Sequence, residues 1–303
     1  MLVSLTGAVE SGLLYALMAL GVYITFRILD FPDLTVDGSF TTGAAIGTVM
    51  TIGGTPPWLA VICAFIGGAL AGTCTGLLHT KGKINGLLSG IIMMIALYSI
   101  NLRILGKPNV SLRGEDNVFD NASIIVIGLI LAIIVKVALD MFFKTNIGLS
   151  LRATGDNSRM IRSFGANTDM TTIIGVALSN ALVACSGALI AHSQNGANNS
   201  MGIGMIVIGL ASVIIGEAIF GAKTIFRATL AVVLGAIIYR IIYALALRVE
   251  WLDAQDMKLI TAVIIICALV VPTIRSTVNS KLTAKRRTEE VLASIHAKNG
   301  GGR

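Results

Sequence analysis

Long apolar runs recur along the whole chain and are separated by short polar connections. The runs can be drawn at about 7–26, 38–52, 58–79, 86–105, 122–143, 170–192, 203–220, 228–248 and 257–275. A helix needs roughly 20 apolar residues to cross the hydrocarbon core of a bilayer. We therefore expect an all-α polytopic membrane protein with about 8–10 transmembrane helices, nine of them marked by these runs.

Two of the runs, 38–52 and 203–220, are short and rich in glycine. Irregular backbone is tolerated at membrane depth only where protein surrounds it or where it lines a cavity. These two of the nine candidate crossings are therefore predicted to be short, broken or re-entrant segments.

The composition supports a membrane protein. Of the 303 residues, 55% are hydrophobic and 13% are charged, whereas charged residues make up about a quarter of a typical soluble domain.

The first 21 residues have no basic segment before the apolar run, so they predict a first span and not a cleaved signal peptide. The four cysteines all lie within apolar runs, a position that favours packing residues over a disulfide or metal set.

Basic residues are concentrated in alternate connections. They lie at Lys81, Lys83, Lys144, Arg152, Arg159, Arg162, Lys223 and Arg227, and in the tail at Lys281, Lys285, Arg286 and Arg287. The connections 53–57, 193–202 and 249–256 contain no lysine or arginine. Because basic loops stay in the cytoplasm, we expect an outer N-terminus, a transmembrane domain over 1–275 and a basic cytoplasmic tail over 276–303. The net charge of +7 follows from this topology and from anionic lipid, and does not indicate nucleic-acid binding.

The segment 148–167, GLSLRATGDNSRMIRSFGAN, is a compact polar and basic interruption between two apolar runs. Gly155, Asp156 and Asn157 predict a turn, and Asp156 or Asn157 is placed to cap a short helix that ends near Gly165. Met160, Ile161 and Phe164 lie on one side of that helix, and Arg159 and Arg162 lie elsewhere around it. Such a helix either rests on the inner leaflet or forms a rigid peg that a cytoplasmic motor grips.

Three stretches resemble ABC importer permeases of the branched-chain amino acid and ribose permease superfamily. LRATGDNSRMIRSFGAN is similar to the cytoplasmic coupling segment of that family. GLLYALMALGVYITFRILDFPDLTVDGSF is similar to its opening helix and the re-entry that follows. GIGMIVIGLASVIIGEAIFGAKTIFRATLAVVLGAIIYRII is similar to its late glycine-rich helix, turn and next helix.

The resemblance implies the permease subunit of an ATP-binding cassette importer, which moves a small polar solute inward across the bacterial inner membrane. It implies a permease dimer, most simply of two copies of this chain, with two ATPase subunits below and one extracytoplasmic substrate-binding protein above. The most similar subgroup works with lipoprotein-type binding proteins and is often assigned to amino acids, including aromatic ones. The residues that this resemblance assigns to ATPase coupling are Gly155, Asp156, Asn157, Arg159, Met160, Phe164 and Gly165.

The chain lacks a nucleotide-binding motif and a set of metal ligands, and one of its segments differs from the usual family sequence. The chain has no GxxxxGK[ST] motif, so we expect it to be no enzyme and expect ATP and Mg²⁺ to bind in the partner ATPase. His79 and His192 have no partner ligands at metal spacing, so we expect no metal and no cofactor in this chain. The neutral NFAHG-like run that is usual in the family is replaced by FPDLTVDGS, with two aspartates, and this argues against a sugar substrate.

Ionisable residues within the spans are candidates for a substrate pathway, because a charge at membrane depth is costly unless it faces a cavity or a partner. Asp33 and Asp37 are spaced i, i+4 and either receive a substrate ammonium group or cap the start of their helix. Glu217 either pairs with Lys223 or Arg227 or closes an inner gate.

Further polar residues in the spans have similar alternatives. Arg240 either binds a substrate carboxylate or pairs with a carboxylate of the protein. Tyr98 and Asn101 join the candidate pathway, although polar residues in spans more often hold helices together. Lys136 and Asp140, spaced i, i+4, predict a mutually neutralised pair.

The alternative function is a stand-alone secondary transporter coupled to protons or sodium ions. In that case Asp37, Glu217 and Arg240 would carry the coupling ion or respond to it. A membrane enzyme is disfavoured, because no nucleophile with a base and an orienting group occurs at a recognisable spacing.

Overall fold

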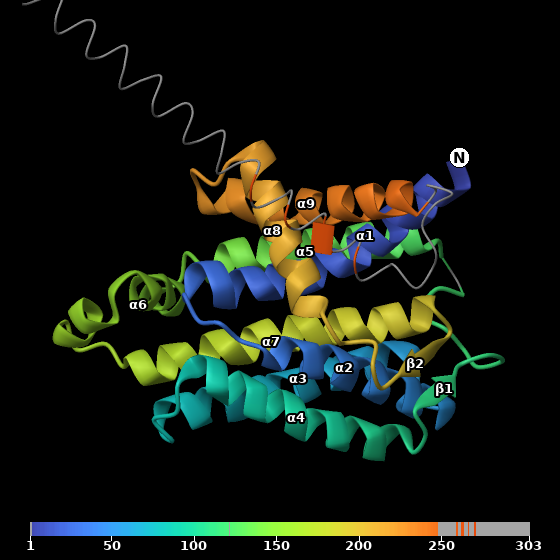
Figure 1. Ribbon diagram of the computed structural model, residues 1–303, viewed down its shortest axis with the longest axis horizontal. Coiled ribbons are helices and arrows are strands. Elements are labelled where there is room, and N and C mark those ends of the chain that lie inside the picture. The colour runs from blue at the N-terminus through green and yellow to red at the C-terminus, as the bar shows by residue number, and fades with distance from the viewer. Residues whose placement is uncertain are drawn as a thin grey trace, which may run out of the picture.

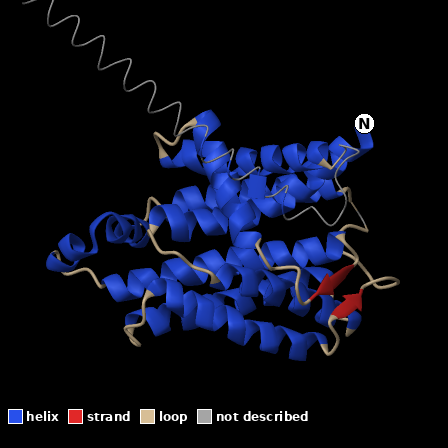
Figure 2. Cartoon of the chain, in the orientation of Figure 1, coloured by secondary structure: helices blue, strands red, loops and turns tan. Residues whose placement is uncertain are grey.

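The computed structural model describes residues 2–120 and 122–247, together with isolated positions between 259 and 270. The described chain is a bundle of helices with one small two-stranded sheet (Figures 1 and 2). Its elements are α1 (Leu2–Tyr23), the π-helix η1 (Ile24–Ile28), α2 (Thr35–Ile52), α3 (Pro57–Thr80), α4 (Gly86–Leu105), β1 (Asn109–Ser111), α5 (Ile124–Phe142), α6 (Asn146–Ser163), α7 (Thr168–Ser193), β2 (Gly196–Asn198), α8 (Met205–Phe220) and α9 (Ile225–Ala246).

The predicted all-α membrane fold is confirmed. Each of the first eight predicted crossings coincides with a helix, and the ninth, 257–275, lies largely outside the described residues. Six of the described helices are long and apolar enough to cross a membrane. The other two crossings are α2 and α8, which are the short glycine-rich runs. The predicted boundary at 275 and the basic tail lie outside the described residues.

Close contacts between small residues hold α7 at the centre of the bundle. On α3, Gly68, Gly72 and Gly76 share one face that lies against α7. A Cβ atom at Gly68 would lie 2.3 Å from the backbone oxygen of Asn180. Only glycine permits so close an approach of two backbones. In a membrane, where apolar lipid removes the hydrophobic driving force between helices, such close van der Waals packing holds the helices together.

The two ends of the bundle differ in character. α6 and the basic connections after α3 and α8 lie at one end, on the left in Figure 1, which we call the α6 end. The β1–β2 ribbon lies at the opposite end, as does the start of α1. The described basic connections therefore share one end, as the alternation of charge predicts, and its assignment to the cytoplasm stays a prediction.

The β1–β2 ribbon is absent from the sequence-based expectation. Its strands pair antiparallel, with Val110 opposite Ala197. The side chain of Asn117 strengthens the connection by donating hydrogen bonds to the backbone oxygen of His192 at 2.7 Å and to Oδ1 of Asn195 at 3.1 Å. The loop after α4 is thereby joined to the segment that leads from α7 into α8.

Candidate functional site

The exposed segment at the α6 end is a helix with a break. Asn157 has non-helical backbone angles, φ −159° and ψ 89°, within α6. Its side-chain Oδ1 accepts a hydrogen bond from the backbone N–H of Met160 at 3.0 Å, which caps the short helix that follows. That helix ends before Gly165, whose φ of +85° is the left-handed conformation typical of a helix end. The sequence predicts this capped helix correctly, with Asn157 as its cap.

The predicted turn over Gly155, Asp156 and Asn157 is correct only for Asn157, where the helix breaks, because Gly155 and Asp156 are helical. Gly155 instead lies against the end of the first helix. A Cβ atom there would lie 1.9 Å from the backbone oxygen of Ile28 and 3.0 Å from Cα of Leu29. Glycine is required at this position because the two backbones touch.

The short helix presents an apolar tip with a charged rim. The exposed fractions of Met160 and Phe164 are 50% and 79%. Asp156 and Arg159 are also exposed, whereas Ile161 is half-buried. Phe164 is the most exposed large apolar side chain in the described part of the chain, and on a helix with a charged rim it suits contact with a partner or with the membrane interface.

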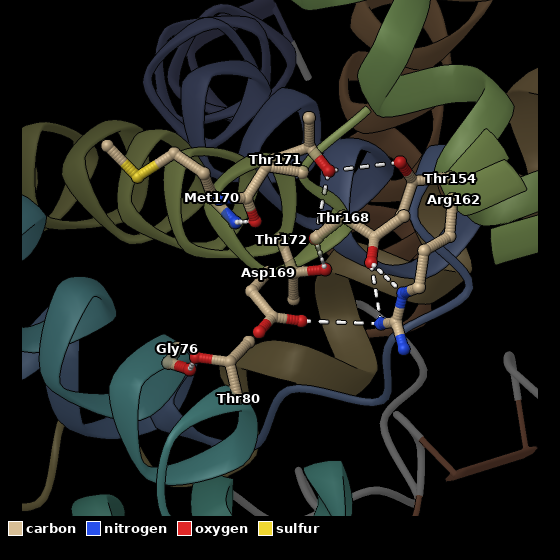
Figure 3. Close-up of polar contacts among 10 residues, drawn as sticks. Gly76, Thr80, Thr154, Arg162, Thr168, Asp169, Met170, Thr171 and Thr172 are labelled. Carbon is tan, nitrogen blue, oxygen red and sulfur yellow. Dashed lines mark hydrogen bonds and ion pairs between the residues drawn. The ribbon is translucent and has the colours of Figure 1, made fainter. Parts of the chain in front are cut away.

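Hydrogen bonds attach this segment to the start of α7 (Figure 3). Nη2 of Arg162 donates to Oγ1 of Thr168 at 2.7 Å and lies 3.4 Å from Oδ1 of Asp169. The hydroxyl groups of Thr154 and Thr171 lie 3.0 Å apart. The short helix is therefore connected to a central helix of the bundle by side-chain bonds as well as by the chain.

The two aspartates of the predicted pathway are buried and fully engaged. Oδ1 of Asp33 accepts from the backbone N–H of Thr35 at 2.9 Å, and Oδ2 accepts from Nδ2 of Asn180 at 2.6 Å. The carboxylate of Asp37 accepts from the backbone N–H groups of Gly204 and Ile206, each at 2.8 Å. Asp33 thus caps the start of its own helix, as one alternative predicts. Asp37 instead caps the start of α8, so the prediction that it caps its own helix is wrong.

Glu217 does form an ion pair, but with a residue that the sequence analysis missed. Its Oε1 lies 3.1 Å from Nε of Arg27, in η1. The predicted partners Lys223 and Arg227 are wrong, because α1 packs against α8 and brings its own end beside the last turn of α8. Arg27 stands at the end of the first apolar run. This position indicates that it lies near the membrane interface, but no local pattern of the sequence points to Glu217 as its partner.

Arg240, within α9, has no carboxylate partner in the described part of the chain. Its guanidinium carbon lies 3.5 Å from the centre of the Tyr15 ring and 5.6 Å from that of Tyr243. Its Nε is buried and has no hydrogen-bond partner. The Tyr15 ring lies over the guanidinium, and a cation–π contact leaves the N–H donors at its edge for another ligand.

The remaining candidates lie in different surroundings. Asn101 is fully buried and its Nδ2 donates to the backbone oxygen of Gly38 at 3.1 Å, so it joins α4 to α2. Tyr98 is 52% exposed on α4, and the structure does not bring it together with Arg240 or Glu217 in any contact among the described residues. The predicted pair of Lys136 and Asp140 is confirmed, and Oδ1 of Asp140 also accepts from Thr229 at 2.7 Å.

The chain belongs to the branched-chain amino acid transport system / permease component family, whose model matches residues 4–270. The buried bundle, the short helix α8 and the exposed capped segment are thus parts of a permease of the ABC transporter type. The protein is a multi-pass membrane protein, and its family acts as the membrane component of such transporters and not as the ATPase.

The chain is also similar to individual transport proteins and to one solved structure. The chain is 42% identical over 287 residues to the tyrosine transport system permease protein of Clostridioides difficile (strain R20291), with 94% of this chain and 95% of that protein covered. It is 25% identical to a galactofuranose transporter permease protein of Escherichia coli (strain K12), with 84% and 75% covered. A solved structure of an inward-facing metal-chelate type ABC transporter has a similar fold, with a TM-score of 0.50 at 16% identity and with 90% and 85% covered.

Proposed function

We propose that this chain is the membrane subunit of an ATP-driven importer that moves an amino acid, of which tyrosine is the first to test, into the cell. The family supports the permease role, and the tyrosine transport relative supports the substrate class. The aspartates that depart from the usual neutral family run are consistent with a substrate other than a sugar, as the sequence analysis predicts.

The observation that carries the proposal is the capped helix at the α6 end. It is rigid, because Asn157 caps its start and Arg162 attaches it to α7. It is also exposed, with Phe164 at its tip. A separate ATPase subunit, which binds ATP and Mg²⁺, grips this helix from the cytoplasm, and closure of the ATPase around nucleotide shifts the permease between two states.

The remaining partners complete the cycle. An extracytoplasmic binding protein of the lipoprotein type delivers substrate at the β1–β2 end, and the permease forms a dimer of two identical chains. The coupling positions are Gly155, Asp156, Asn157, Arg159, Met160, Phe164 and Gly165. The chain resides in the inner membrane with its C-terminal tail in the cytoplasm.

Arg240 is the residue we assign to the substrate carboxylate. Its buried Nε has no hydrogen-bond partner, and a guanidinium binds a carboxylate through paired N–H donors. Asp33 and Asp37 are weaker candidates for the ammonium group, since backbone and side-chain donors already occupy their oxygens. The pathway roles of Tyr98, Asn101 and Glu217 stay predictions.

The test is co-purification of the chain with its membrane and cytoplasmic partners, followed by identification of the small molecule that the external protein retains. We expect an ATPase and an external protein in the complex, a bound amino acid, and ATP hydrolysis that rises when the loaded external protein is added. A complex that contains no ATPase, or hydrolysis that is indifferent to the external protein, would contradict the proposal.

A further inference from the structure

Side chains from two other segments hold α8 at its two ends. At its start, the carboxylate of Asp37, in the first turn of α2, accepts the backbone N–H groups of Gly204 and Ile206. The contact is close, because a Cβ atom at Gly202 would lie 2.0 Å from the backbone oxygen of Asp37. Since bonds between a buried carboxylate and N–H groups are among the stronger hydrogen bonds in proteins, this end of α8 is firmly attached to α2.

The attachment at the other end is of a different kind. Oε1 of Glu217, in the last turn of α8, lies 3.1 Å from Nε of Arg27, with the two side chains 16% and 59% exposed. Exposed ion pairs contribute little to stability and exchange readily with water. The start of α8 is therefore fixed by hydrogen bonds to Asp37, whereas the polar contact of its last turn is an ion pair near the surface. Beside Glu217, Gly216 packs on α9, where a Cβ atom would lie 2.0 Å from the backbone oxygen of Ala231, so a shift of the last turn also moves against α9.

Arg27 lies in the segment on which α6 rests. It belongs to η1, where the hydrogen-bond pattern of α1 widens and Leu29 N–H bonds to the backbone oxygen of Ile24 at 3.0 Å. The backbone of Gly155 touches Ile28, and the buried side chains of Leu29 and Leu151 belong to one hydrophobic core cluster. A displacement of α6 therefore bears on η1 as well as on α7, to which α6 is hydrogen-bonded. π-Helical turns occur often at functional sites, because their backbone can rearrange locally.

We propose that the ion pair between Arg27 and Glu217 transmits the movement of α6 to α8, which pivots about its attachment to Asp37. In this inference, which rests on the proposed function, Arg27 and Glu217 are positioning residues and not substrate ligands. Movement of α6 shifts η1, and the ion pair passes that shift to the last turn of α8. The ion pair explains why these two charged residues lie near the membrane, and it gives neither of them a role in carrying a coupling ion.

The experiment uses the complex of the full chain with its ATPase and binding protein in proteoliposomes, with radiolabelled tyrosine as the probe. The variants are Arg27→Gln, Glu217→Gln and the reversed pair Arg27→Glu with Glu217→Arg. Lys81→Gln is the matched control, because Lys81 is an exposed basic residue at the same end and takes part in no ion pair among the described residues. Tyrosine accumulated per ATP hydrolysed is measured for each, with the melting temperature as a check on folding.

Each single variant is expected to lower uptake per ATP by at least about fivefold, in the range of ordinary coupling between sites. The reversed pair is expected to recover most of this loss, and Lys81→Gln is expected to match the unmodified chain. Melting temperatures are expected to fall only slightly, since Arg27 is 59% exposed, whereas Glu217, which is 16% exposed, is the more costly of the two to leave unpaired.

Two results would overturn the inference alone: single variants that couple as well as the unmodified chain, or a reversed pair that is no better than the singles. A second readout separates coupling from folding. Nitroxide labels are placed at Ser158 on α6 and at Ile219 on α8, and the distance between them is measured with and without ATP. We expect this distance to stay nearly constant in the unmodified complex when ATP binds, because the two helices move together, and to change in Glu217→Gln. Failure of the unmodified complex to accumulate tyrosine with ATP would instead contradict the proposed function.

Discussion

At the scale of single residues, burial and hydrogen bonding decide what each charged or polar side chain does. Asp37 and Thr48 lie on the same helix and are both buried. The Asp37 carboxylate accepts two backbone N–H groups, whereas the hydroxyl of Thr48 has no hydrogen-bond partner. Removal of these two side chains should therefore have opposite consequences.

We expect Asp37→Ala to destabilise the protein by about 2 kcal/mol or more, because two partly buried N–H groups lose their partner and a buried one left unpaired costs about 1–3 kcal/mol. Asp37→Asn keeps an acceptor and should lose less. Thr48→Val, which has nearly the same shape, serves as the control and should leave the melting temperature in detergent unchanged or higher. Equal melting temperatures for Asp37→Ala and Thr48→Val would show that the attachment of α8 to α2 is unimportant.

The pair of Lys136 and Asp140 gives a second prediction at this scale. Both side chains are buried, and the Lys136 ammonium also lies 3.1 Å from the centre of the Phe226 ring. Removal of one partner leaves a buried charge, at a cost of about 3–5 kcal/mol. Lys136→Met should therefore lower the melting temperature sharply, and Lys136→Met with Asp140→Leu should recover much of the loss. A double variant less stable than the single would contradict this account.

At the scale of elements, α6 depends on its contact with η1. Gly155→Ala would place a Cβ atom 1.9 Å from the backbone oxygen of Ile28, whereas Gly7 has no atom within 4 Å of such a position. Gly7→Ala is thus a matched control on a helix. We expect Gly155→Ala to reduce ATP-driven uptake at least about fivefold, as for an ordinary loss of coupling, and Gly7→Ala to leave it unchanged. Equal uptake by the two variants would mean that this contact does not take part in coupling.

The tip of the short helix gives a separate prediction, about binding of the ATPase. Phe164 is 79% exposed, so Phe164→Asp should fold normally. It should also retain less ATPase on co-purification, because loss of a hot-spot side chain at the centre of an interface costs about 2 kcal/mol or more. The exposed but laterally placed Ser158→Ala is the control. Full retention of ATPase by Phe164→Asp would place the interface elsewhere.

At the scale of the whole molecule, the local patterns of the sequence predict far more than its distant contacts. Length and apolarity predict the first eight crossings, and the i, i+4 spacing predicts the pair of Lys136 and Asp140, because each of these signals lies within one helix. The contact of Asp37 with Gly204 joins residues 167 positions apart, and that of Arg27 with Glu217 joins residues 190 apart. Such pairs arise only when helices pack. The strands β1 and β2 have three residues each and leave too little pattern to predict.

The measurement that tests the central claim most directly is uptake of radiolabelled tyrosine into proteoliposomes that contain this chain, its ATPase and its binding protein. We predict accumulation against a gradient when ATP is supplied to the ATPase side, and none when either partner or ATP is left out. Accumulation at the same rate by the chain alone, driven by a proton or sodium gradient without any ATPase, would contradict the account.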